Sequence, residues 1–123
     1  MKKNYGRILT VQDISCIGQC SLTVALPIIS ACGHETIILP SAILSSHTYR
    51  FKGWTFRDLT DDIPAILDHW KSEGIKFDAC YTGYLGSKRQ IDIIKGIFAD
   101  MLVAGGLKIV DPAMADEGLL YSG

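Results

Sequence analysis

Short apolar runs alternate with amphipathic stretches along this chain of 123 residues. Four of the runs are apolar, partly β-branched, and bounded by polar residues, glycine or proline, which is typical of strands. They are Arg7–Gln12, Thr36–Leu39, Phe77–Thr82 and Leu107–Val110. We expect the second strand to stop at Pro40 and the last strand to be short and buried.

Amphipathic stretches between these runs predict helices. The first, Leu22–Cys32, follows a turn at residues 18–21 and ends at Gly33, a residue suited to a left-handed cap. Pro27 lies inside this stretch and lacks a backbone donor, so it should kink the helix.

The second helix is marked by Ile63, Ile66, Leu67 and Trp70, whose spacing places them on one face. Asp61 or Asp62 can cap its start, which leaves Pro64 in the first turn, and Glu73-Gly74 ends it.

The third helix begins at Ser87-Lys88-Arg89-Gln90, a capping box in which the Ser hydroxyl and the Gln amide bind each other's exposed backbone N–H groups. Its apolar positions continue through Met101-Leu102 to Gly105-Gly106.

Alternating strands and helices at this spacing predict parallel strands joined by right-handed crossovers. We therefore expect an α/β fold with three layers, a mostly parallel sheet with helices on both faces. Residues 43–57 alternate only loosely and contain a glycine, so they predict a small exposed flap or a pair of short strands.

Composition and charge narrow the class of protein. Hydrophobic residues make up 48% and charged residues 20% of the chain, with a net charge of −1 and no basic stripe, so nucleic acid is not an expected partner. The longest apolar stretch, Leu22–Cys32, is too short to span a membrane, and Gln12 and Asp13 interrupt any signal peptide. We expect a cytoplasmic protein.

The chain has four cysteines. Cys16 and Cys20 could form a redox or metal-binding pair, but the simpler interpretation is that all four are buried thiols in a reducing compartment.

Polar and glycine-rich residues follow each predicted strand. They are Gln12-Asp13, Ser41–Tyr49, Thr82–Ser87 and Asp111–Asp116. Functional groups of parallel sheets gather at the carboxyl ends of strands, so these segments predict one site. Asp111 and Asp116, beside Pro112, suit a metal–phosphate site, although a turn carboxylate and a cap would look alike. His47 could hold a substrate or simply be exposed on the flap, and Gly83-x-x-Gly86 could be a tight turn.

The residues that carry these features resemble one family. Ile8–Asp13, Ser46-His47-Thr48, Thr82–Ser87 and Val110-Asp111-Pro112 occur in this order and at this spacing in the pyridoxal/pyridoxamine kinases of the ribokinase-like superfamily. The resemblance covers essentially the whole chain, which corresponds to the N-terminal part of a family member. Residues 1–123 would then be part of a single ribokinase-like kinase domain that is incomplete.

The resemblance implies ATP-dependent phosphorylation of the 5′-hydroxymethyl group of pyridoxamine or pyridoxal, in vitamin B6 salvage. It places Asp13, His47, Thr48 and Tyr84 around the pyridine ring. It places Asp111 and Asp116 near the ATP phosphates and Mg²⁺, with a monovalent cation as a further candidate, and it implies a homodimer.

The family's catalytic base is an Asp in a Gly-x-Gly-Asp turn, and no such turn occurs in residues 1–123. We therefore expect no catalytic residue in this chain and no phosphate transfer by the isolated polypeptide.

Three positions depart from the family pattern. Asp13 stands where many members have Ser, Ala115 where they usually have Gly, and Glu117 adds a negative charge to the same loop. A carboxylate at position 13 could pair with a protonated pyridine nitrogen. The alternatives to a B6 kinase are a hydroxymethylpyrimidine kinase of the same superfamily and a non-catalytic module that binds a vitamer or another chain.

Overall fold

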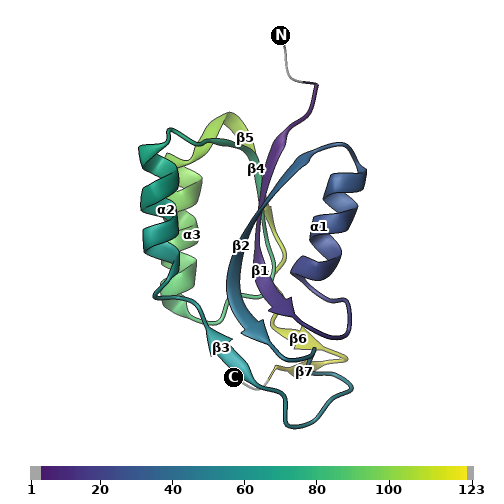
Figure 1. Ribbon diagram of the computed structural model, residues 1–123. Coiled ribbons are helices and arrows are strands. Elements are labelled where there is room, and N and C mark those ends of the chain that lie inside the picture. The colour runs from purple at the N-terminus through teal and green to yellow at the C-terminus, as the bar shows by residue number, and fades with distance from the viewer. Residues whose placement is uncertain (1–3, 122–123) are drawn as a thin grey trace.

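A computed structural model describes residues 4–121 (Figure 1). The larger elements are β1 (Arg7–Ser15), α1 (Leu22–Ala31), β2 (Glu35–Leu44), β3 (Phe56–Asp58), α2 (Ile63–Ser72), β4 (Phe77–Thr82), α3 (Lys88–Asp100) and β5 (Leu102–Val110). A short hairpin of β6 (Ala115–Asp116) and β7 (Leu119–Leu120) follows them.

The sheet has five strands in the order β3-β2-β1-β4-β5. β1 lies between β2 and β4 and is parallel to both, and β4 is parallel to β5. Among the described strands of this sheet only β3 is antiparallel, where Ala42–Leu44 of β2 pair with Phe56–Asp58. The predicted α/β class, mostly parallel with helices on both faces, is confirmed: α2 and α3 cover one face and α1 the other (Figure 1).

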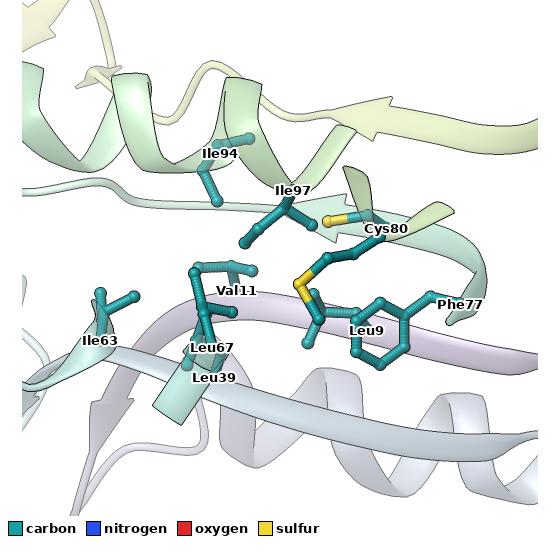
Figure 2. Close-up of a cluster of buried hydrophobic side chains, with 10 residues drawn as sticks. Leu9, Val11, Leu39, Ile63, Leu67, Phe77, Cys80, Ile94 and Ile97 are labelled. Atoms are coloured by element: carbon teal, nitrogen blue, oxygen red, sulfur yellow. The ribbon is translucent and has the colours of Figure 1, made fainter. Parts of the chain in front are cut away.

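The hydrophobic core lies between the sheet and the α2–α3 layer (Figure 2). Strand residues Leu9, Val11, Leu39, Phe77 and Cys80 meet helix residues Ile63, Leu67, Ile94 and Ile97 and the C-cap residue of α3, Met101, all of them buried. The Trp70 and Phe77 rings add an edge-to-face contact, with centroids 5.8 Å apart. The apolar residues whose spacing predicted α2 therefore form the face of that helix that packs in this core.

On the opposite face of the sheet, α1 is only partly buried. Leu22 and Ala25 are buried, whereas Leu26 and Ile28 of the same helix are exposed. Within the described residues, no helix is long and apolar enough to cross a membrane.

Two strand predictions were too short. β1 continues to Ser15 and β2 runs through Pro40 to Leu44. A proline is tolerated inside β2 because β3 pairs with this strand only from Ala42 onward, so one side of β2 is open at Pro40.

The prediction that Leu107–Val110 is a short buried strand was wrong. β5 begins at Leu102 and passes a register irregularity before reaching Leu107. The side chains of Leu107 and Val110 are 64% and 59% exposed, because β5 is an edge strand whose one partner within residues 4–121 is β4.

The predicted helix caps were only partly right. Gly33 has a positive φ of 85°, as a left-handed cap requires. Asp62 precedes α2 but makes no side-chain capping bond. Ser87 caps α3 by accepting from the Gln90 N–H, but the Gln90 side chain does not return the bond to Ser87.

Candidate functional site

The carboxyl ends of β1 and β4 form the switch point of the sheet. From β1 the chain passes to β2 on one side, and the later strands β4 and β5 lie on the other side. Open α/β sheets bind ligands in the crevice outside such a point. Asp13 lies near the carboxyl end of β1 at this place, and the loop that contains Gly83 and Tyr84 follows β4.

Asp13 is buried, with 5% of its surface exposed, and its Oδ2 accepts a hydrogen bond from the Ser15 hydroxyl at 3.0 Å. A buried carboxylate is costly unless its oxygens are bonded, so the Ser15 hydroxyl stabilises Asp13 at the strand end. The second oxygen has no hydrogen-bond partner within residues 4–121 and is available to a ligand.

Gln12 crosses from β1 to β4. Its amide nitrogen donates to the Thr10 hydroxyl at 2.9 Å, and its amide oxygen lies against Gly83. A Cβ at position 83 would stand only 2.6 Å from that oxygen, so any other residue here would force the Gln12 side chain to move. Gly83 is thus more than a turn residue.

The flap carries His47 and Thr48 and is attached to the loop after β1. The His47 N–H donates to the Ile17 carbonyl at 3.0 Å, and the imidazole Nδ1 accepts from the Tyr49 N–H at 3.2 Å. Because Nδ1 is an acceptor, a neutral ring carries its proton on Nε2, which can donate to a ligand. The ring also packs edge-to-face on Phe51, with centroids 5.2 Å apart.

The loop after β4 is held to β2. The Ser41 hydroxyl donates to the Tyr84 carbonyl at 3.1 Å, and the Gly83 N–H donates to the Val11 carbonyl at 3.0 Å. These bonds orient the backbone that presents the half-buried Tyr84 side chain.

The segment after β5 brings the carboxylates. The Asp111 N–H donates to the Thr82 carbonyl at 3.0 Å, and the Ala113 N–H donates to the Asp111 carbonyl at 2.8 Å, which makes a tight turn around Pro112. Asp116 belongs to the β6–β7 hairpin. Desolvation, and then the neighbouring Asp116, Cys20 and Asp111 side chains, raise the pKa of the Tyr121 phenol, so its hydroxyl stays protonated at neutral pH and can donate a hydrogen bond.

These segments surround one cavity of about 1080 Å³. All six residues that the sequence predicts for substrate, ATP or metal binding line it: Asp13, His47, Thr48, Tyr84, Asp111 and Asp116. The structure brings them together, while their individual roles stay predictions. The volume is close to the upper end of the range of small-molecule sites, about 1,000 Å³.

Charge at the cavity favours a bound cation. Its lining includes the carboxylates of Asp13, Asp111, Asp116 and Glu117, and no lysine or arginine from the described part of the chain. Residues 4–121 contain no group of three or more metal-ligating side chains. Mg²⁺ is commonly held by one or two carboxylates together with substrate phosphates, so Asp111 and Asp116 fit an ion that arrives with a nucleotide.

Sequence reasoning missed several lining residues. Ser15, Trp54, Phe56 and Tyr121 all contribute to the cavity. The spacing of two between Trp54 and Phe56 was a usable signal, because alternate residues of an extended segment share a face. Nothing in the sequence marks Tyr121, whose place depends on the fold of the hairpin.

No protein-family model and no curated protein matches the sequence. Solved structures do. A "putative phosphomethylpyrimidine kinase" of Bacteroides thetaiotaomicron, solved with pyridoxal, is 44% identical with a TM-score of 0.91, over 97% of this chain and 41% of its own. The pyridoxal kinase of Lactobacillus plantarum is 32% identical with a TM-score of 0.88, over 96% of this chain and 42% of its own.

A more distant neighbour shows the fold alone. The pyridoxal kinase of Leishmania donovani, solved with ADP and pyridoxine, is 16% identical with a TM-score of 0.86. The chain spans about two fifths of the length of these neighbours. These neighbours confirm the predicted resemblance to pyridoxal kinases and the ribokinase-like fold, of which this chain forms only a part.

Proposed function

We propose that residues 1–123 form the N-terminal part of an ATP-dependent kinase that phosphorylates the 5′-hydroxymethyl group of pyridoxal or pyridoxamine. The observation that carries the proposal is the single cavity lined by all six predicted residues. The 44% identity with a protein solved with pyridoxal supports the B6 vitamers as substrates.

In this proposal the vitamer lies at the carboxyl ends of β1 and β4. Asp13 accepts a hydrogen bond from the protonated pyridine nitrogen, and the Nε2–H of His47 donates to a ring substituent. Tyr84 and Thr48 close the pocket beside the ring, and Ser15 fixes the Asp13 carboxylate through its 3.0 Å bond. Together they would orient the 5′-hydroxyl towards the nucleotide, which is how positioning contributes to phosphoryl transfer.

Asp111 and Asp116 would hold the Mg²⁺ that accompanies ATP. The ion neutralises charge on the phosphates and so supplies electrostatic stabilisation. The tight turn at Pro112 and the β6–β7 hairpin bring the two carboxylates to the same cavity. The general base, an Asp in a Gly-x-Gly-Asp turn, would come from residues beyond this chain, together with most of the adenine pocket.

The first experiment is to read the coding sequence past Gly123 and express the full-length polypeptide that contains these residues. We expect a Gly-x-Gly-Asp turn downstream and ATP-dependent formation of pyridoxal phosphate. The isolated residues 1–123 should show no transfer above background, since loss of a general base alone lowers rates by about 10²–10⁴-fold. A coding sequence that stops at Gly123, in a chain that binds pyridoxal without turnover, would replace the kinase with the non-catalytic module.

A second candidate is a hydroxymethylpyrimidine kinase, because the Bacteroides neighbour carries a phosphomethylpyrimidine kinase name. Parallel assays with pyridoxal, pyridoxamine and hydroxymethylpyrimidine separate the two activities. A higher kcat/KM for the pyrimidine would transfer the proposal to that substrate.

A further inference from the structure

Gln90 is a fully buried amide in the first turn of α3, with 1% of its surface exposed. The sequence assigns it a local role as the second member of a capping box. In the structure its side chain instead points into the space between α3, β2 and the segment after β3, where polar groups from several loops meet.

The amide oxygen of Gln90 accepts from the Gly86 N–H at 2.7 Å. Its nitrogen donates to the Ser41 carbonyl and to the Thr60 hydroxyl, both at 2.9 Å, with Asp58 Oδ1 at 3.3 Å. The orientation of the amide is set by these partners, because only an oxygen can accept from Gly86 and only a nitrogen can donate to Ser41. One side chain thus joins the β2 end, the β3–α2 segment and the β4–α3 loop.

Two of these connections, those to Ser41 and Gly86, lead to Tyr84 in the wall of the cavity. Ser41, whose carbonyl binds Gln90, donates its hydroxyl to the Tyr84 carbonyl at 3.1 Å. Gly86 lies two residues beyond Tyr84, close enough for a Cβ there to stand 3.8 Å from the Tyr84 ring and 3.9 Å from that of Phe56. The loop from Gly83 to Ser87, which we call the Tyr84 loop, is therefore tied to β2 through Gln90.

We propose that Gln90 is a positioning residue that fixes the Tyr84 loop against β2 and β3, and thereby sets the distance across the pocket between Tyr84 and the flap. The inference rests on the proposed kinase function and deepens it by adding a residue that acts on vitamer binding without contacting the vitamer. Buried networks of this kind hold a unique geometry only when every member is satisfied.

The test uses the full-length polypeptide with Gln90→Leu, Gln90→Glu and, as a matched control, Ile94→Val. Ile94 is buried on the same face of α3, one turn further on, and its apolar side chain packs in the core without any of the hydrogen bonds that Gln90 makes. For each variant, kcat and the KM values for pyridoxal and ATP are measured from pH 6 to pH 9, together with amide exchange at Gly86.

Gln90→Leu should raise the KM for pyridoxal about tenfold, because the Ser41 carbonyl and the Gly86 N–H lose their partner. The KM for ATP should stay within about twofold of wild type. Amide exchange at Gly86 should accelerate. Ile94→Val should leave both KM values and the exchange at Gly86 unchanged.

Gln90→Glu is nearly isosteric and separates positioning from general destabilisation. Its carboxylate still accepts from the Gly86 N–H, but it cannot donate to the Ser41 carbonyl and is repelled by Asp58. Arg89, a nearby cation, attracts Asp58 and forms an ion pair with Asp61. Protonation restores one donor, so the ratio of its KM for pyridoxal to that of wild type should fall as pH decreases. Exchange at Gly86 should remain slow.

The outcomes are distinguishable. A wild-type protein that phosphorylates pyridoxal, with Gln90 variants whose KM for pyridoxal and pH profile match wild type, overturns the positioning role and leaves the kinase in place. A fall in kcat with equal changes in both KM values overturns it in favour of general destabilisation. If the wild type phosphorylates none of the substrates, the kinase fails, and fluorescence titration of pyridoxal with exchange at Gly86 decides the role of Gln90 separately.

Discussion

Single side chains at the carboxyl end of β1 decide what the cavity can recognise. Asp13 keeps one carboxylate oxygen bonded to Ser15 and presents the other to the cavity. The family pattern suggested a departure at this position, and the structure adds the hydroxyl that holds the carboxylate in place.

Asp13→Ser should weaken pyridoxamine binding and leave ATP affinity nearly unchanged, because it removes a charged acceptor for the ring nitrogen. A hydrogen bond to a charged group contributes roughly 1.5–3 kcal/mol, which corresponds to a loss of about 10- to 100-fold. Calorimetry on the full-length protein measures this. Asp62→Ser is the control, since Asp62 makes no side-chain capping bond. Equal vitamer affinities in Asp13→Ser and wild type would reduce Asp13 to a turn residue.

Cys80 provides a second prediction, on stability. Burial raises the pKa of its thiol from 9.0 to about 12. The folded state therefore keeps the proton where the unfolded state loses it, so the free energy of unfolding should fall as pH rises from 9.0 towards about 12. At about pH 10.5 this loss amounts to about 2 kcal/mol.

Urea titrations at about pH 8 and pH 10.5 check this contribution. Cys80→Ala should be less stable than wild type at both pH values, because it leaves a cavity in the core. Its free energy of unfolding should, however, fall by about 2 kcal/mol less than that of wild type when the pH is raised from about 8 to about 10.5. Cys32→Ala, at an exposed thiol, should keep the wild-type dependence. If the free energy of unfolding changed equally with pH in Cys80→Ala and wild type, the Cys80 thiol would not be the cause of the pH dependence.

At the scale of elements, the flap and the loop after β1 depend on each other. Gly18 has a positive φ of 110°, and a Cβ there would stand 1.8 Å from the His47 ring. The His47 N–H donates to the Ile17 carbonyl in the same loop. The position of His47 in the cavity is therefore set by a glycine 29 positions earlier in the chain.

Gly18→Ala should displace the His47 ring and lower pyridoxal affinity by about tenfold, besides a backbone strain of about 1–2 kcal/mol. Gly33→Ala is a matched control, because Gly33 also has a positive φ and a Cβ there would meet nothing within 4 Å. Both variants should lose stability, measured by thermal unfolding, but only Gly18→Ala should lose affinity in a fluorescence titration. A similar affinity in the two variants would refute the coupling.

At the scale of the whole molecule, the sheet has an exposed apolar edge. Leu107 and Ile109 of β5 are 64% and 48% exposed, and the charged Lys108 is turned towards the Phe98 ring of α3, 5.6 Å from its centroid. An uncharged open strand of this kind recruits other chains. The homodimer expected from the family resemblance stays a prediction.

The polypeptide of residues 1–123, expressed alone, should dimerise through this edge or aggregate. Sedimentation at tens of micromolar measures the effect, and Leu107→Lys should reduce it, because a charge guards the edge. A monodisperse monomer that unfolds cooperatively would contradict the prediction and would favour a self-contained binding module.

Local pattern was sufficient for the order of the main strands and helices and for the place of the candidate site. Apolar spacing predicted β4 with its observed bounds and the buried face of α2, because period and chain direction are properties of neighbouring residues. Asp13, Tyr84 and Asp111 were expected at one edge of the sheet, since parallel strands place their carboxyl ends there, and all three line the same cavity.

Only the tertiary structure decided which contacts these residues make. The capping pattern assigned Gln90 to its own helix, whereas its partner Ser41 lies 49 positions away. Leu107–Val110 has the apolar composition of a buried strand, and its exposure follows from its place at the edge of the sheet. Burial and long-range hydrogen bonding depend on which segments pack together, and a run of neighbouring residues carries no record of that packing.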